Sequence, residues 1–320
     1  MGVGASELAE ERLSQDCEKR WEFSLNIPFD AISGLRPLAQ GSACSCQCGN
    51  LGAKKVVIKT LKPDSSETDA SDLDRELGVL QLLRHPNIVE LVGAGIAPQG
   101  GMFVATEFLS RGTLSHAIGT DASEGTAWIG RALVRSWFPM KEAFRQAAGV
   151  ASALAYMHDE AIPGAKVVHR DIKGNNLAFT ADGTLKLFDF GIAKVLRPQD
   201  SMGDDLYKMT GETGSMRYMA PEVAKSLPSN ETADVYSFAL VMWEMVSIER
   251  PFQFYSVQEL CEQVIDGEVR PRLAPEWPED FKDILKSCWS ADVKTRLSMA
   301  DVEKRLRRLL PIYVAESPER

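Results

Sequence analysis

The sequence predicts an α+β protein in which a small strand-rich part precedes a larger helical part. Residues 56–59, Val-Val-Ile-Lys, are predicted to form a strand early in the chain, in which successive side chains alternate between two faces. Helical spacing of apolar residues follows over 144–154. Residues 233–245 are apolar on nearly all sides, which is typical of a helix at the centre of a helical domain.

Several further elements are expected between these segments. Cys44, Cys46 and Cys48 alternate along one predicted strand. Leu177–Phe179 and Leu185–Leu187 are short alternating runs that flank a turn at Asp182-Gly183, which predicts a hairpin.

A first helix is expected to begin at Ser71, because Ser71 and Asp74 have the spacing of a capping box. The acidic run over 63–74 is read as the connection leading into it. Residues 118–137 are turn-rich and then amphipathic, and are interpreted as an insertion between two helices.

Composition indicates a globular protein. Apolar residues make up 44% and charged residues 25% of the 320 residues, which excludes a mainly disordered or fibrous chain. The net charge of −9 gives no global attraction to nucleic acid or to anionic lipid, so neither is expected as a partner.

Location is predicted from the absence of apolar runs. No run approaches the roughly 20 residues of a membrane span, so a cytoplasmic protein is expected. The opening residues Met1 to Ser6 have the spacing of an N-myristoylation signal, and membrane contact is expected only if Gly2 is acylated.

The six cysteines suggest no disulfide framework and are read as reduced thiols. The alternative for Cys44, Cys46 and Cys48 is a soft-metal site, which is disfavoured because no paired Cys/His cluster occurs elsewhere in the sequence.

Three motifs in fixed order carry the chemistry. They are His169-Arg170-Asp171-Ile172-Lys173-Gly174-Asn175-Asn176, then Asp189-Phe190-Gly191, then Ala220-Pro221-Glu222. In their order and spacing the chain resembles the protein kinases over roughly residues 30–312. The resemblance implies a two-lobed fold, with a β-rich N-lobe carrying one main helix and a larger helical C-lobe.

The catalytic groups follow from this resemblance. Asp171 would orient the substrate hydroxyl, and Lys173 would steady the transferred phosphoryl group. Lys59, held by Glu76, would contact the phosphates of ATP. Asn176 and Asp189 would ligate Mg²⁺, since a hard cation prefers oxygen ligands. Asp234 would brace the catalytic loop, and Arg296 would pair with Glu222.

Further positions are expected to contact the nucleotide, with Glu107 and Leu109 doing so through their backbone groups. The full set is Leu38, Gly41, Cys46, Val57, Lys59, Thr106, Glu107, Leu109 and Ala178. Val57 stands where the family has alanine, and Ala178 where it has a larger apolar residue.

Within the family, the chain resembles the tyrosine-kinase-like group, especially its Raf-like members. Lys173 and Ser215 favour serine and threonine over tyrosine as acceptors on protein substrates, and dual specificity stays open. An upstream kinase acting on Thr210 or Thr213 is expected, because Arg170 precedes the catalytic aspartate and a phosphate in that segment would neutralise it.

One motif departs from the family pattern. The phosphate-covering loop retains only its middle glycine, Gly41, with Ala39 and Cys44 in the outer positions. Glycine permits close approach of backbone amides to phosphates, so this loss leaves a pseudokinase, acting as a scaffold or ATP-binding module, as the alternative. Phosphotransfer to a small molecule is a further alternative.

The resemblance also sets the expected domain limits. Residues 1–27 are predicted to be an N-terminal tail, 28–313 the kinase domain and 314–320 a C-terminal tail. Within the domain, the N-lobe is expected over about 28–108 and the C-lobe over about 109–313.

Overall fold

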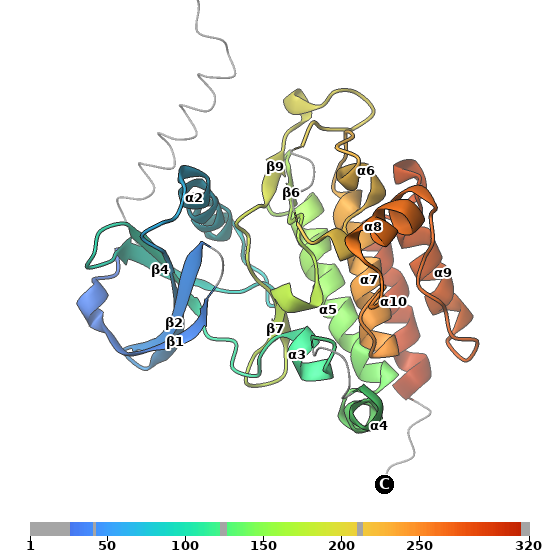
Figure 1. Ribbon diagram of the computed structural model, residues 1–320, viewed down its shortest axis with the longest axis horizontal. Coiled ribbons are helices and arrows are strands. Elements are labelled where there is room, and N and C mark those ends of the chain that lie inside the picture. Colours follow the sequence, from blue (N-terminus) through green and yellow to red (C-terminus); the bar gives the residue numbers. More distant parts are fainter. Residues whose placement is uncertain (1–25, 41–42, 122–126, 210–213, 315–320) are drawn as a thin grey trace, which may run out of the picture. The chain divides into compact units, whose positions relative to one another are not determined.

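The structure, a computed structural model, describes residues 26–40, 43–121, 127–209 and 214–314. They form two compact units (Figure 1). The N-terminal unit contains the described residues up to Leu82 together with Val89–Phe108. The C-terminal unit contains Leu83–Ile88 and the described residues from Leu109 onward.

The N-terminal unit is a five-stranded antiparallel sheet with one long helix, which agrees with the β-rich lobe and single main helix that the resemblance implies. The strand order in the sheet is β1-β2-β3-β5-β4. The elements are β1 (Ile32–Gln40), β2 (Cys44–Leu51), β3 (Lys54–Leu61), α2 (Glu67–Leu82), β4 (Leu91–Ile96) and β5 (Met102–Glu107), preceded by a short 3-10 helix at Phe29–Ala31.

The two faces of β3 have different surroundings because its side chains alternate. Val56 and Ile58 are fully buried in an apolar cluster that also contains Phe103 of β5. Val57 and Lys59 therefore lie on the opposite face, where both are partly exposed. The strand thus places a lysine on the face turned away from this cluster.

The first helix begins four residues before the predicted start. Its N-terminal turn is capped at Ser66, whose backbone N–H donates to the Asp69 carboxylate at 2.8 Å while the Asp69 N–H donates to the Ser66 hydroxyl at 3.2 Å. Ser66 and Asp69 have the same spacing as Ser71 and Asp74, so the sequence offers two capping boxes and the earlier one is used. The expected connection over 63–74 is therefore partly helical.

The C-terminal unit is mainly helical. Its longer helices are α5 (Met140–Asp159), α7 (Thr232–Ser247), α9 (Glu279–Cys288) and α10 (Met299–Val314), and α5, α7 and α10 run alongside one another in Figure 1. The shorter helices are α3 (Leu114–Ile118), α4 (Ala127–Trp137), α6 (Pro221–Ala224) and α8 (Val257–Glu259). A π-helical segment (Leu260–Asp266) continues α8. Single 3-10 turns lie at Gly174–Asn176, Pro198–Asp200, Met216–Tyr218 and Val293–Thr295.

The predicted central helix is confirmed by α7, in which every residue is buried. The predicted helix over 144–154 is confirmed by α5. Small and apolar residues dominate the buried face of α5, which lets neighbouring helices pack closely against it. The predicted insertion contains α4, with residues 122–126 outside the described ranges.

The C-terminal unit also contains two small antiparallel sheets of two strands each. The strand β6 (Lys166–Val168) pairs with β9 (Lys194–Leu196), and β7 (Leu177–Phe179) pairs with β8 (Leu185–Leu187). The predicted hairpin is therefore confirmed with its predicted strand limits. Gln146, a buried residue of α5, fixes the turn of this hairpin. Its Nε2 donates to the Gly183 carbonyl at 2.7 Å, and its Oε1 accepts the Leu185 N–H at 3.0 Å.

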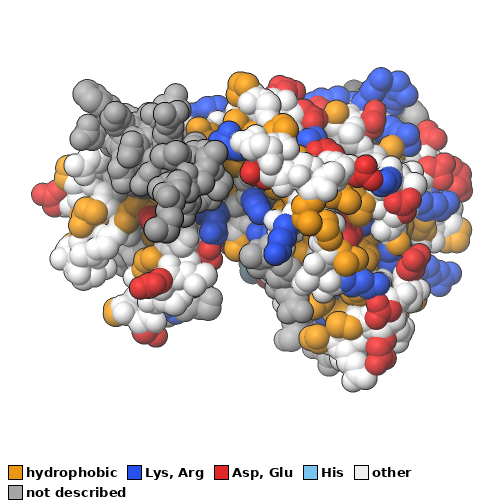
Figure 2. All heavy atoms as spheres, turned by 90° about the horizontal axis from the view of Figure 1, so that it is seen from above, with side chains coloured by type: hydrophobic (Ala, Val, Ile, Leu, Met, Phe, Trp, Pro, Cys, Tyr) orange, Lys and Arg blue, Asp and Glu red, His pale blue; other side chains and the backbone are white. Residues whose placement is uncertain are grey.

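The described helices include none that combines enough length with enough apolar character to cross a membrane. On the face shown in Figure 2, acidic and basic side chains are interspersed over the described surface.

Candidate active site

In the N-terminal unit, Lys59 and Glu76 form an ion pair. The Lys59 Nζ lies 2.6 Å from the Glu76 Oε2, with 23% of the lysine side chain and 6% of the glutamate side chain exposed. Glu76 lies on the buried face of α2, next to Leu77. The pair holds the lysine at a defined point of the sheet face, and the sequence prediction of this pairing agrees with the geometry.

Besides Lys59, five predicted nucleotide contacts lie on strands of this sheet, Glu107 at the end of β5 among them. Val57 pairs with Cys48 of β2 and with Thr106 of β5, and Cys46 pairs with Lys59. Directly paired residues share a sheet face, so Thr106, Cys46 and Cys48 lie on the face of Val57 and Lys59. Leu38 lies on β1 with 47% of its surface exposed. Gly41 falls outside the described residues.

Glu107 is linked to Glu90 by two hydrogen bonds. Its backbone N–H donates to the Glu90 carbonyl at 3.0 Å, and its carboxylate accepts the Glu90 N–H at 2.7 Å. The Glu107 N–H is thereby occupied by a contact within the N-terminal unit. Its predicted backbone contact with adenine stays a prediction.

In the C-terminal unit, the loop between β6 and β7 is fixed by Asp234 of α7. The Asp234 carboxylate, 1% exposed, accepts the backbone N–H groups of His169 at 2.7 Å and Arg170 at 2.8 Å. Burial alone would raise the pKa of this carboxyl, but the hydrogen bond and charge of His158 and the backbone N–H of His169 hold the pKa below its usual value. Asp234, which the sequence predicts to hold the catalytic loop, is thus an ionised carboxylate in the protein interior.

Asp171 is the centre of the polar contacts in this loop. Its Oδ2 accepts from the Lys173 Nζ at 2.6 Å and from the Asn176 Nδ2 at 2.9 Å, and its Oδ1 accepts the Ser215 N–H at 2.9 Å. The Lys173 Nζ also donates to the Ser215 hydroxyl at 2.8 Å. The Asp171 side chain is 12% exposed, so it is positioned on several sides while part of it stays accessible.

The predicted metal ligands lie on adjoining backbone segments. Phe188, which precedes Asp189, donates its N–H to the Asn176 carbonyl at 3.0 Å. The Asn176 Nδ2 donates to both the Asp171 carbonyl and the Asp171 carboxylate, so its Oδ1 is the side-chain atom left to face a cation. Asp189 has a positive φ of 67°, and the ring of Phe190 packs edge-on against His169 at 4.8 Å between centroids.

Gly214 has a positional role that the sequence did not reveal. It has a φ of +102°, and a Cβ placed on it would lie 2.7 Å from the Arg170 carbonyl oxygen. A side chain there would therefore push Ser215 away from Asp171. Nothing in the local residue pattern identifies the distant loop that Gly214 approaches.

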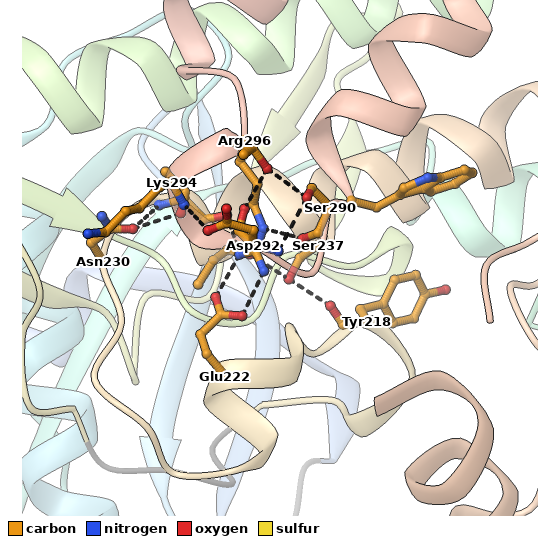
Figure 3. A network of polar contacts seen from close by, with 12 residues as sticks. Tyr218, Glu222, Asn230, Ser237, Ser290, Asp292, Lys294 and Arg296 are labelled. Carbon is orange, nitrogen blue, oxygen red and sulfur yellow. Dashed lines mark hydrogen bonds and ion pairs between the residues drawn. The ribbon is translucent and has the colours of Figure 1, made fainter. Parts of the chain in front are cut away.

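Arg296 forms the predicted ion pair with Glu222. Its two terminal nitrogens donate to the two carboxylate oxygens at 2.6 Å and 2.7 Å, and its Nε donates to the Ser290 carbonyl at 2.8 Å (Figure 3). Both side chains are buried. In the same network the Ser237 hydroxyl donates to the Tyr218 carbonyl at 2.7 Å, which attaches the segment after Ser215 to α7.

The structure thus brings the predicted residues together in two groups, one in each unit. Lys59, Val57, Thr106 and Cys46 share one region of the sheet, and Glu76 of α2 is paired with Lys59 there. In the C-terminal unit, Asp171, Lys173, Asn176 and Asp189 lie in adjoining loops, with Ala178 buried on β7 and Leu109 the first residue after the boundary of the units. Thr210 and Thr213 fall outside the described residues.

Comparison with known families decides the classification. Residues 36–306 match the model of the family described as protein tyrosine and serine/threonine kinase. The chain belongs to this family. The family resemblance drawn from the sequence motifs is thereby confirmed, as is the two-lobed α+β fold class that it implied.

This kinase chain is similar to several curated proteins. It is 33% identical to serine/threonine-protein kinase VIK of Arabidopsis thaliana over 258 residues, which are 79% of this chain and 54% of that protein. It is 27% identical to serine/threonine-protein kinase STY17 of the same plant, over 92% of this chain and 47% of the relative. It is 29% identical to dual specificity protein kinase shkE of Dictyostelium discoideum, over 90% of this chain and 37% of the relative.

The chain spans about half the length of the two Arabidopsis relatives. Their names describe whole proteins that contain additional sequence. The family assignment therefore applies to the kinase domain.

Proposed function

We propose that this chain is an active protein kinase that transfers the γ-phosphate of ATP to serine or threonine hydroxyls of other proteins. The observation that carries this proposal is the surroundings of Asp171, whose carboxylate is held by Lys173, Asn176 and the Ser215 N–H while part of it stays accessible. A carboxylate held in this way can accept a hydrogen bond from an incoming hydroxyl and orient its oxygen for attack.

Cationic groups complete the chemistry. Lys173 lies next to Asp171 and can balance charge that develops on the transferred phosphoryl group. Lys59, positioned by Glu76, can bind phosphate oxygens of the nucleotide. Phosphoryl transfer depends mainly on such positioning and electrostatic stabilisation, so the presence of these groups supports the proposal.

The donor set fits the metal on which the family generally relies. Asn176 and Asp189 offer an amide oxygen and a carboxylate, which are oxygen ligands of the kind that Mg²⁺ prefers. Mg²⁺ bound with ATP would neutralise phosphate charge. The protein residues would hold it through one or two oxygens, with the remaining ligands supplied by the nucleotide and water.

The preference for serine and threonine rests on Lys173 and Ser215. Their side chains hydrogen-bond to each other at 2.8 Å, directly beside the Asp171 carboxylate. The relatives with printed serine/threonine names support the same preference, whereas those named dual specificity kinases keep tyrosine as a second acceptor. Phosphoamino acid analysis of a labelled acceptor protein would distinguish these two specificities.

The alternative function is a pseudokinase that acts as a scaffold. It is favoured by the phosphate-covering loop, in which Ala39 and Cys44 stand in place of two glycines. A transfer assay with radiolabelled ATP, Mg²⁺ and a generic acceptor protein separates the two functions. Label in the acceptor supports the kinase, whereas binding of ATP without transfer to any acceptor supports the scaffold.

We also propose that phosphorylation of Thr210 or Thr213 by an upstream kinase raises activity. Arg170 supports this proposal, because it lies beside Asp171 and in a small cavity lined in part by Met209, next to the segment that contains both threonines. A phosphate there would pair with the guanidinium. Unchanged activity after phosphatase treatment, together with unchanged activity of the Thr210→Ala/Thr213→Ala variant, would exclude this control.

We propose a cytoplasmic location, with membrane contact only through an acyl chain on Gly2. One acyl chain alone gives weak and reversible attachment. Labelling of cells with a tagged myristate, with Gly2→Ala as the control, tests the acylation directly.

A further inference from the structure

The strand β2 carries three thiols on one face of the sheet. Cys44, Cys46 and Cys48 are two residues apart, so their side chains point to the same side. Cys46 is paired with Lys59, and directly opposite residues have Cβ atoms about 4.5 to 5.5 Å apart and share a face. The three thiols therefore lie on the face that carries the Lys59–Glu76 ion pair.

These thiols are reduced and partly exposed. Cys288 provides a contrast, because burial raises the pKa of its thiol to about 12 and makes it unreactive. Cys261 in the C-terminal unit is partly exposed, like the three thiols of β2. Access is a requirement for thiol chemistry, so the thiols of β2 and Cys261 meet it and Cys288 does not.

A bound metal does not account for the run of thiols. Within the described ranges, no three His, Cys, Asp or Glu side chains form a group that could hold a metal ion. The soft-metal alternative for these cysteines therefore finds no support in the described geometry.

An internal disulfide fits poorly. Neighbouring same-face residues of a strand are separated by two rises, or about 6.6 Å. This is near the upper end of the roughly 4.4 to 6.8 Å between Cα atoms that disulfides span. A partner thiol from outside the protein meets no such constraint.

We propose that Cys46 is a modification site at which a low-molecular-mass disulfide of the oxidised glutathione type forms a mixed disulfide that blocks nucleotide binding. The inference rests on the proposed function, because it assigns the nucleotide to this face. In the reaction the Cys46 thiolate attacks one sulfur of the disulfide, a new S–S bond forms, the original S–S bond breaks, and one thiolate leaves. An added thiol reverses the step.

Among the three thiols of β2, Cys46 is the one whose cross-strand partner is Lys59. A tripeptide-sized group on this thiol would occupy the space over Lys59 that the phosphates require, and its carboxylates would compete for the ammonium group. Cys48 lies opposite Val57 and Cys44 opposite Leu61, so adducts on these residues would lie farther from the cation.

The test uses the full chain, first reduced and then treated with oxidised glutathione. Mass spectrometry locates the adduct, and calorimetry measures the ATP dissociation constant before treatment, after it and after reduction with dithiothreitol. We expect an adduct on Cys46, a loss of ATP affinity of at least about 10-fold, and full recovery on reduction. Saturating Mg·ATP should slow formation of the adduct.

Two variants control for the position of the thiol. Cys46→Ala, compared with its own reduced form, should keep its ATP affinity after treatment. Cys261→Ser, which removes a partly exposed thiol of the other unit, should remain as sensitive as the parent. Loss of ATP affinity in treated Cys46→Ala would overturn the assignment to Cys46.

The two proposals fail in different ways. A reduced chain that binds no ATP contradicts the proposed function and removes the basis of this inference. A reduced chain that binds ATP equally well before and after full modification of Cys46 overturns the inference alone. Adduct formation that is unaffected by Mg·ATP also overturns it.

Discussion

At the scale of residues, Asp171 and Asp234 show how surroundings assign a role to the same side chain. Asp234 is 1% exposed and uses its oxygens to hold backbone N–H groups, whereas the Asp171 side chain is 12% exposed beside Lys173. The first organises the loop and the second faces outward from it. Both positions were predicted from motifs, but the His158 contact that helps keep Asp234 ionised was not, because it comes from a distant helix.

Gly214 gives a prediction with a matched control. Gly214→Ala should lower the rate of phosphotransfer by about 10-fold or more, because its Cβ would meet the Arg170 carbonyl at 2.7 Å and displace Ser215 from Asp171. Gly203→Ala introduces a similar backbone strain at φ +107°, but its Cβ would have open space. It should retain most activity, and equal losses in the two variants would indicate that strain alone is responsible.

The buried pair of Glu222 and Arg296 predicts a large effect on stability. Arg296→Met should lower the free energy of unfolding by about 3 to 5 kcal/mol, because it leaves a buried carboxylate without its partner. Arg307→Met, which removes an exposed ion pair with Glu303, should cost less than about 1 kcal/mol. Urea denaturation measures both, and a loss below about 1 kcal/mol in Arg296→Met would contradict this explanation.

At the scale of elements, the start of α2 shows what a local motif leaves open. Two Ser-x-x-Asp sequences occur within nine residues, and each has the spacing of a capping box. The pattern predicts a helix in this segment but does not decide between the two starts. The contacts of Ser66 with Asp69 decide it, and the helix gains four residues.

Substitution of each serine tests this assignment. Ser66→Ala should lower the free energy of unfolding by about 1 kcal/mol, the usual effect of losing an N-cap side chain. Ser71→Ala, inside the helix, should be neutral or slightly stabilising because alanine favours helix. Denaturation curves of the two variants should therefore differ, and the reverse order would place the helix start at Ser71.

At the scale of the whole molecule, the order of strands and then helices could be predicted because alternation and helical spacing are local patterns. The assignment of Leu83–Ile88 to the C-terminal unit could not, since it depends on contacts such as that of the Asn87 amide with the Leu185 carbonyl at 2.8 Å. The candidate site was predictable through its motifs. The engaged Glu107 amide and the close approach of Gly214 were not, because both depend on neighbours distant in sequence.

The central proposal is that phosphotransfer by this chain requires both Lys59 and Asp171. The most direct measurement is transfer of radiolabelled phosphate by Lys59→Met and Asp171→Asn, with Lys54→Met and Asp200→Asn as surface controls and circular dichroism to verify folding. We predict that each site variant loses at least about 10²-fold of the rate, since each removes charge placed for the transition state, and that both controls stay near the parent. Near-parent transfer by a folded Lys59→Met or Asp171→Asn would contradict the claim.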